Sequence, residues 1–221
     1  MPKNTFKQLP AEKRERITSA AATLFAERGF SATDVAQIAK QAGVAKGSLY
    51  NYFESKEDLY FFVCRDGLER SRRAVYGGIE PGWDVYRQIE HIFRQGARFA
   101  RAKPEYIQLY LAVSSAGMDR FARDLSLEVE KYTADHLKKL IGDSIRQGIV
   151  RPDIDVNLTA FLINSLYIMF VISLVSSHFR IRMKEYLAIQ GELDDEAVSD
   201  PLDRVIRLIQ SFLRPVEPPP S

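Results

Sequence analysis

Hydrogen-bonding side chains are concentrated in one short segment near the start of the chain, residues 43–53 (GVAKGSLYNYF). The segment offers a cation at Lys46, hydroxyl groups at Ser48 and Tyr50 among others, and an amide at Asn51. Such a cation contacts a phosphate or a guanine edge, and short amide or hydroxyl side chains bond base edges in the major groove. Small residues at the beginning of the segment, including Gly47, let its backbone approach such a surface closely. The chemistry predicted here is therefore recognition of a nucleic-acid duplex.

Two short helices are predicted to hold this segment in place. Apolar residues recur at helical spacing from Val35 to Ala42, and Gly43 ends that helix. The second helix covers about residues 46–52, with Leu49 and Phe53 facing inward, because isolated helices of this length are unstable in water. Two short helices joined by a glycine turn have the spacing of a helix-turn-helix motif. In that motif the second helix lies in the major groove.

A longer helix over residues 10–28 precedes the pair and is ended by Gly29, and Thr33 stands where the next helix needs its N-cap. Residues 10–56 are thus predicted to form one helix-turn-helix domain. Its characteristic positions are filled by Gly29, Phe30, Thr33, Ile38, Ala39, Ala42, Gly43, Val44, Gly47, Tyr50, Tyr52, Phe53, Lys56 and Leu59. Over about residues 11–60 this set resembles the DNA-binding domain of the tetracycline-repressor (TetR) family of bacterial transcriptional regulators.

The resemblance implies a set of DNA contacts. Thr33 would bind a phosphate through its hydroxyl and the amides at its helix start, and Lys56 would bind another. The full set of expected contacts is Thr33, Lys46, Gly47, Ser48, Tyr50, Asn51, Tyr52 and Lys56; for Tyr52 the alternative is structural packing. One departure from the family is Ala45, where a capping Ser or Thr is common, so the recognition helix is expected to lack a side-chain N-cap.

The rest of the chain is predicted to be helical, which gives an all-α fold of about nine helices. Ser55 caps a connecting helix, residues 57–78, and a run of glycines and Pro81 then breaks the chain. A C-terminal ligand-binding and dimerisation domain is expected over residues 83–214. The tail, residues 215–221, is rich in proline and is predicted to be disordered.

A homodimer is expected, because one recognition helix contacts too few base pairs to select a genomic site. The helix predicted from residue 156 to about residue 189 is apolar on all sides, and the last helix, residues 202–213, adds an apolar face. In the TetR family such helices form a four-helix bundle with the partner; the alternative is that both are core of their own domain. The interface residues expected by this resemblance are Leu166, Phe170, Val205, Ile206, Ile209 and Phe212.

Polar groups among the aromatic side chains of the C-terminal domain indicate a ligand pocket, because a buried polar group needs a partner. The candidates are Tyr110, His136, Asn164 and Tyr167, each of which has the alternative of being a satisfied core residue. The resemblance implies a repressor that binds a palindromic double-stranded DNA operator as a dimer. A small-molecule effector, expected to be hydrophobic, would release the DNA by tilting the fourth helix.

A membrane association is the alternative for residues 156–179, which contain no Lys, Arg, Asp or Glu and are long enough to span a bilayer. The segment also holds two asparagines, a threonine and several serines, which favours a helix buried in a protein core. We therefore expect no membrane partner.

Other function classes find little support in the sequence. The one cysteine, Cys64, permits no intrachain disulfide and fits a reducing cytoplasm. His91, His136 and His178 are too dispersed for a helical metal pair, and no phosphate-binding loop or nucleophile elbow is present. No enzyme activity, metal or cofactor is expected. The net charge is only +2, but residues 1–56 carry nine Lys or Arg against five Asp or Glu, which fits an anionic partner.

Overall fold

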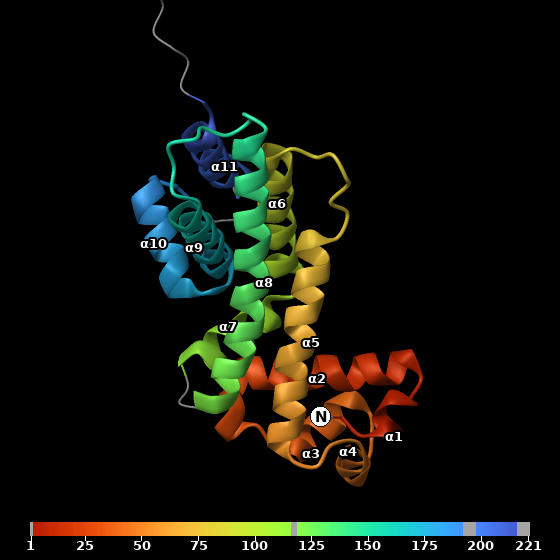
Figure 1. Ribbon diagram of the computed structural model, residues 1–221. Helices are drawn as coiled ribbons and strands as arrows, with labels where there is room; N and C mark the ends of the chain where they lie inside the picture. The colour runs from red at the N-terminus through yellow and green to blue at the C-terminus, as the bar shows by residue number, and fades with distance from the viewer. Residues whose placement is uncertain (1, 116–118, 192–197, 216–221) are drawn as a thin grey trace, which may run out of the picture. The chain divides into compact units, whose positions relative to one another are not determined.

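The computed structural model describes residues 2–115, 119–191 and 198–215, and within them the chain forms helices and no strand, as the predicted all-α fold requires (Figure 1). The eleven helices are α1 (Asn4–Lys7), α2 (Ala11–Ala32), α3 (Val35–Ala42), α4 (Lys46–Tyr52), α5 (Lys56–Tyr76), α6 (Val85–Ala102), α7 (Pro104–Ser115), α8 (Asp119–Arg146), α9 (Val156–Val175), α10 (Ser177–Leu187) and α11 (Ser199–Leu213). The proline-rich tail, residues 215–221, lies almost wholly outside the described residues.

The chain divides into two compact units. The first consists of Met1–Arg70 with Lys103–Leu125, and the second of Ser71–Ala102 with Ser126–Ser221. The division falls inside α5, whereas the sequence analysis separated the domains at the glycine-rich break after that helix. Helix α7, which was expected in the C-terminal domain, packs on α2 in the first unit.

The helices of the first unit begin and end where local chemistry dictates. The backbone of α2 leaves helical geometry at Gly29, which has a φ of 74°, and one further turn follows it. Helix α3 ends at Gly43 in the left-handed conformation, as predicted, because glycine adopts a positive φ without steric cost. The apolar faces of these helices meet in a core that contains Ile17, Phe25, Ile38, Leu49 and Phe53, all buried.

An arginine joins three helices of this unit. Arg70 on α5 forms an ion pair with Glu15 on α2, with Nη2 and Oε2 2.5 Å apart, and a second with Asp66 one turn earlier. The guanidinium also lies 5.8 Å from the ring centroid of Tyr106 on α7. The same ring covers Gly67 so closely that a Cβ there would collide with it. The bond to Arg70 is the main cause that lowers the pKa of Glu15, so the pair is ionised at neutral pH.

The second unit is a bundle of α6, α9 and α11 with most of α8 and with α10. Its core includes Ile89 and Phe93 of α6, Ile141 of α8, Ile163 of α9 and Ile206 of α11. These helices pack through their apolar side chains, which form a regular stripe at helical spacing in α6 and occur on all sides of α9.

The single helix predicted from residue 156 to about residue 189 is wrong. The structure breaks it at Ser176, whose φ of −89° and ψ of 125° are those of extended backbone, and α10 begins at Ser177. The start of α9 agrees with the prediction. There the side chain of Asp155 caps the helix by accepting a hydrogen bond from the Leu158 amide.

Candidate nucleic-acid interface and pocket

Helix α4 presents most of the predicted contact residues to solvent. Lys46, Gly47 and Asn51 are exposed, and the Tyr50 side chain keeps 47% of its surface accessible although it is aromatic. Ser48 is half-buried. On the opposite face Leu49 is buried in the core, as predicted, so the helix is held from behind. An exposed polar face on an anchored short helix is the arrangement that a recognition helix needs.

The N-terminus of α4 has the deficiency that the sequence predicted. Ala45 occupies the N-cap position, and no side chain accepts a hydrogen bond from the first turn there. Its carbonyl oxygen still accepts the Ser48 amide at 2.9 Å. The helix therefore depends on contacts elsewhere for its order, because a missing cap costs about 1 kcal/mol.

The predicted role of Thr33 as a helix cap is wrong. Its side chain is 2% exposed, and its hydroxyl donates inward, 2.7 Å from the carbonyl oxygen of Gly29 and 3.1 Å from that of Leu24. Asp34 is the N-cap of α3, and its carboxylate accepts the Ala36 amide at 2.8 Å. The Thr33 hydroxyl thus closes the end of α2 and does not point to solvent, where a phosphate would lie.

Lys56 also bonds within the chain. Its ammonium donates to the carbonyl oxygens of Ser31 at 3.2 Å and Thr33 at 3.0 Å, and it lies 4.5 Å from the ring centroid of Phe30. These contacts tie the first turn of α5 to the end of α2. An ammonium has three N–H donors, so one remains for a partner outside the chain.

Tyr52 packs inside the chain and does not face solvent. It is buried, and its ring centroid lies 6.0 Å from that of Phe6. Phe6 belongs to α1, a helix of four residues that the sequence analysis did not predict. For Tyr52 the packing alternative therefore describes its position better than a DNA contact.

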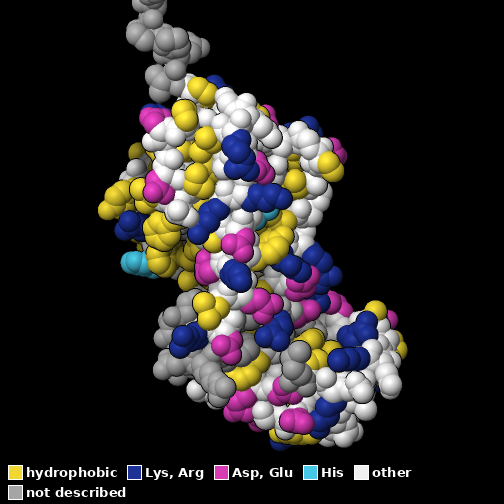
Figure 2. Space-filling view, in the orientation of Figure 1, with side chains coloured by type: hydrophobic (Ala, Val, Ile, Leu, Met, Phe, Trp, Pro, Cys, Tyr) yellow, Lys and Arg dark blue, Asp and Glu magenta, His cyan; other side chains and the backbone are white. Residues whose placement is uncertain are grey.

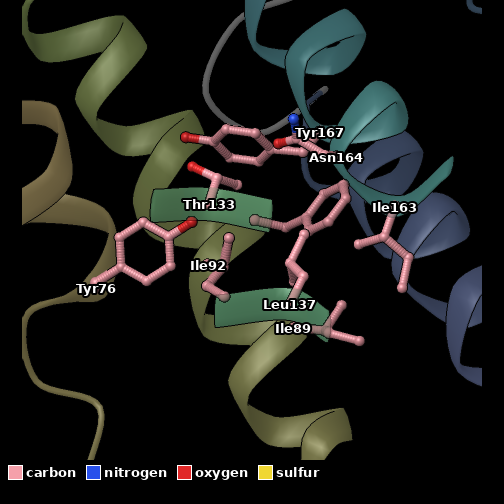
Figure 3. Close-up of a pocket in the computed structure, with 9 residues that line it drawn as sticks. Tyr76, Ile89, Ile92, Thr133, Leu137, Ile163, Asn164 and Tyr167 are labelled. Atoms are coloured by element: carbon pink, nitrogen blue, oxygen red, sulfur yellow. The ribbon is translucent and has the colours of Figure 1, made fainter. Parts of the chain in front are cut away.

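A small pocket lies within the second unit and is lined by side chains from four helices (Figure 3). It is bounded by Tyr76, Ile89, Ile92, Phe93, Thr133, Leu137, Ile163, Asn164 and Tyr167. The space that these side chains leave is barely enough for a water molecule, so a larger ligand requires them to move. Its lining is largely apolar, which fits the hydrophobic ligand that the sequence analysis expected.

Two of the four predicted ligand-binding residues, Asn164 and Tyr167, line this pocket. Tyr167 meets the Phe93 ring edge to face at 5.5 Å and lies directly on the backbone of Gly96, where any Cβ would collide with its ring. Asn164 donates a hydrogen bond to Glu130 at 3.3 Å. Burial raises the pKa of Tyr167, so its hydroxyl remains protonated at neutral pH.

The other two predicted residues are placed differently. His136 is not among the residues that line the pocket. Its ring lies 4.9 Å from that of Tyr76, which does line it, and its Nε2 atom is buried with no hydrogen-bond partner among the described residues. Burial, followed by the nearby Lys139, lowers the pKa of His136. Tyr110 lies on α7 in the first unit and does not line this pocket.

The predicted dimer residues divide into buried and exposed groups. Phe170, Ile206 and Ile209 are buried in the core of their own chain, and Val205 is partly buried against it. Leu166 and Phe212 are exposed. The exposed group also contains side chains that the sequence analysis missed, which are Leu158, Phe161, Leu162 and Met169 on α9 and Leu208 on α11.

The all-helical fold and the solvent-facing α4 define a helix-turn-helix DNA-binding protein. Residues 17–61 match the model of the family described as bacterial regulatory proteins, tetR family. The transcriptional repressor KstR2 of Mycobacterium tuberculosis (strain ATCC 25618 / H37Rv) is 31% identical over 152 residues, covering 66% of this chain and 73% of KstR2. The chain therefore belongs to the TetR family of bacterial transcriptional regulators.

Solved structures share this fold along most of their length. The transcriptional regulator FadR of Bacillus subtilis, solved in complex with stearoyl-CoA, has a TM-score of 0.69 at 20% identity, covering 90% of this chain and 99% of FadR. AibR, solved in complex with isovaleryl coenzyme A and operator DNA, has a TM-score of 0.66 at 19% identity, covering 89% and 97%. At these sequence identities the similarity shows a shared fold only.

Proposed function

We propose that this regulator is a repressor that binds a palindromic operator as a homodimer and releases it when a small molecule occupies the second unit. The observation that carries the proposal is the exposed face of α4. There Lys46, Tyr50 and Asn51 are accessible while Leu49 anchors the helix from behind. With Gly47 at the surface, the helix backbone can approach base edges in a major groove.

The proposed DNA contacts fall into two kinds. Lys46, Ser48, Tyr50 and Asn51 would contact base edges or phosphates from α4. Lys56 would use its remaining N–H on a phosphate, while its other two hold the end of α2. Thr33 and Tyr52, both buried, would act by positioning the helices that make the contacts.

A second copy of the chain is the proposed partner of α9 and α11. Leu158, Phe161, Leu162, Leu166 and Met169 recur along α9 at helical spacing, and α11 adds two exposed apolar side chains, Leu208 and Phe212. Hydrophobic side chains gather over α9 and α10 in the view of Figure 2. Two helices from each copy would form a four-helix bundle, which buries this surface and sets two recognition helices at a fixed separation.

A lipid bilayer is the alternative environment for the exposed apolar side chains of α9. Among the described residues, α9 is the one helix that is long enough and apolar enough to cross a membrane. Core helices of other proteins share this property. The opposite face of α9 carries Ile163 and Phe170, which pack in the core of the second unit. Spanning a membrane would remove these residues from that core, whereas pairing with a second copy leaves them in place. We therefore propose a cytoplasmic protein without a membrane partner.

A small molecule whose apolar part enters the pocket of the second unit is the proposed effector. The pocket between α5, α6, α8 and α9 offers apolar walls with a few polar groups, among them the Tyr167 hydroxyl and the Asn164 amide. An acyl thioester of coenzyme A is our first candidate, supported by the stearoyl-CoA and isovaleryl coenzyme A bound in the similar structures. Such a molecule would displace Tyr167. It could release DNA only by binding the DNA-free conformation more tightly than the DNA-bound one.

The experiment that tests this proposal is enrichment of bound DNA from genomic fragments, followed by footprinting of the enriched sites. We expect an inverted repeat with half-sites about one helical turn apart, or a multiple of it. Titration of a bound operator with short- and long-chain acyl-CoA should then release the DNA while the thioester stays intact, because the proposed role is binding without turnover. Enrichment of no sequence over random fragments would contradict the function.

A further inference from the structure

The N-terminal segment of the chain lies against the C-terminal end of the recognition helix. The backbone amide of Lys3 donates to the carbonyl oxygen of Tyr52 at 2.9 Å. The Lys3 ammonium donates to the carbonyl of Tyr50 at 3.0 Å, and the Thr5 hydroxyl donates to that of Asn51 at 2.6 Å. All three acceptors belong to the last turn of α4.

Every carbonyl of that last turn is thereby satisfied. A helix leaves its last four carbonyl groups without intrahelical partners. In α4 the Leu49 carbonyl accepts the Phe53 amide at 2.8 Å, and residues 3 and 5 supply donors to the other three. The ammonium of Lys3 also places a positive charge at the negative end of the helix dipole.

An aromatic anchor holds the segment in place. Phe6 is 3% exposed, and its ring centroid lies 4.9 Å from that of Phe53 and 5.2 Å from that of Phe62 on α5. On the other side the Arg14 guanidinium donates to the Lys7 carbonyl at 2.6 Å, which ties the segment to α2. The donors at residues 3 and 5 are therefore fixed relative to the core of the first unit.

We propose that residues 3–7 form a clamp that keeps the recognition helix ordered in the absence of DNA. Lys3, Thr5 and Phe6 are its positioning residues. The helix has seven residues and no side-chain N-cap, so the contacts at its C-terminal end add to the order that the buried Leu49 provides. The inference rests on the proposed DNA binding, because the clamp raises operator affinity by increasing the fraction of molecules whose α4 is already formed.

Hydrogen exchange of the free protein tests the clamp directly. Thr5→Val removes the bond to the Asn51 carbonyl without changing charge, and Phe6→Ala removes the anchor. Both should speed exchange of the amides of residues 50–53 while those of α9 stay unchanged, by about five- to tenfold for Thr5→Val. Gln8→Ala is the matched control, because Gln8 is exposed and its side chain makes no bond among the described residues.

Operator affinity supplies the second measurement. For Thr5→Val we expect the Kd to rise by the factor by which the ordered fraction of α4 falls, which is smaller than the change in exchange while most molecules still have α4 formed. The salt dependence of log Kd should stay unchanged, because no cation is lost. If Lys3 instead contacts a phosphate, Lys3→Met should make the salt slope shallower and leave hydrogen exchange in α4 unchanged. That pattern would overturn the clamp in favour of a DNA contact.

Three outcomes decide the proposal. Faster exchange in α4 for Thr5→Val but not for Gln8→Ala supports it. Exchange in Thr5→Val equal to that of the unmodified chain overturns it, even if Phe6→Ala fails to fold. Because exchange is measured without DNA, a chain with a working clamp that enriches no operator contradicts the proposed function and leaves the clamp standing.

Discussion

The ammonium of Lys56 lies over the face of Phe30, with Nζ 4.5 Å from the ring centroid, and bonds two carbonyl oxygens at the end of α2. One of these carbonyls belongs to Thr33, whose hydroxyl closes the same turn from inside. The connection between α2 and α3 is thus fixed from both sides. A residue expected to act only on DNA also holds the motif together.

Replacing Lys56 with Met should produce two effects. Loss of the carbonyl contacts should lower the free energy of unfolding by about 1–2 kcal/mol. Loss of the phosphate contact should weaken binding to every DNA sequence and make the salt slope shallower by about one. Urea denaturation and binding titrations at several salt concentrations measure both, with Lys138→Met, an exposed site in the second unit, as the control. An unchanged salt slope would make Lys56 a positioning residue alone.

Gly47→Ala should separate folding from recognition. A Cβ at this position meets no atom within 4 Å, and alanine favours a helix more than glycine does. The variant should therefore be more stable by about 0.5–1 kcal/mol while operator affinity falls, because the methyl group stands between the backbone and the bases. Thermal denaturation and a binding titration give the two values. Full affinity in a stabilised variant would place Gly47 outside the contact surface.

The dimer is best tested at residues that a single chain leaves exposed. Ile209→Asp is unsuitable, because Ile209 is 3% exposed and a charge there would unfold the second unit. Phe161→Asp, at a side chain that is 67% exposed, should yield a folded monomer with greatly weakened operator binding. Ile181→Asp on α10 is the matched exposed control. Sedimentation equilibrium measures the association, and a dimer that persists in Phe161→Asp would exclude this face.

Gly96→Ala should be strongly unfavourable for its size. The added methyl group would collide with the Tyr167 ring, so we expect a loss of about 1–3 kcal/mol in the free energy of unfolding. Gly142→Ala on α8 is the matched control, because the nearest atom to its Cβ is a guanidinium nitrogen 3.7 Å away. There the change should be neutral or stabilising. If both variants unfold alike, the contact between Gly96 and Tyr167 is not tight.

His136 should make stability depend on pH. Burial lowers its pKa below the ordinary value of 6.5, so the unfolded chain binds a proton more readily than the folded one. Its contribution to stability is therefore complete above pH 6.5 and is lost as the pH falls from that value toward the lowered pKa. His136→Gln should flatten this part of the pH profile in urea denaturation. His178→Gln, at an exposed site, controls for the loss of a histidine.

The helix-turn-helix itself was predictable because the residues that end its helices and define their buried faces lie close together in the sequence. Gly43 ends α3 by adopting a positive φ, and the alternation of Leu49 and Phe53 with polar residues separates the two faces of α4. The cap of α3 was assigned to Thr33, whereas the structure has Asp34 there. The sequence could not separate them, because both residue types can cap a helix and only the three-dimensional path of the chain decides between adjacent candidates.

Other features carry too weak a sequence signal. Helix α1 has four residues and so shows no periodicity, and its role depends on carbonyl groups of α4 that any sequence would offer. The break at Ser176 has neither glycine nor proline to mark it. Apolar spacing also cannot separate residues that face the chain's own core, such as Ile206, from those that stay exposed on the chain, such as Leu208.

Cys64 gives the first unit a natural reporter of its own opening. The thiol is buried and is the chain's single cysteine, and burial raises its pKa to about 12. A thiol-reactive dye can therefore label the protein only while this unit transiently opens. The labelling rate, followed with and without operator, would measure how much DNA binding reduces the frequency of this opening. The measurement needs no engineered probe and has no background from a second cysteine.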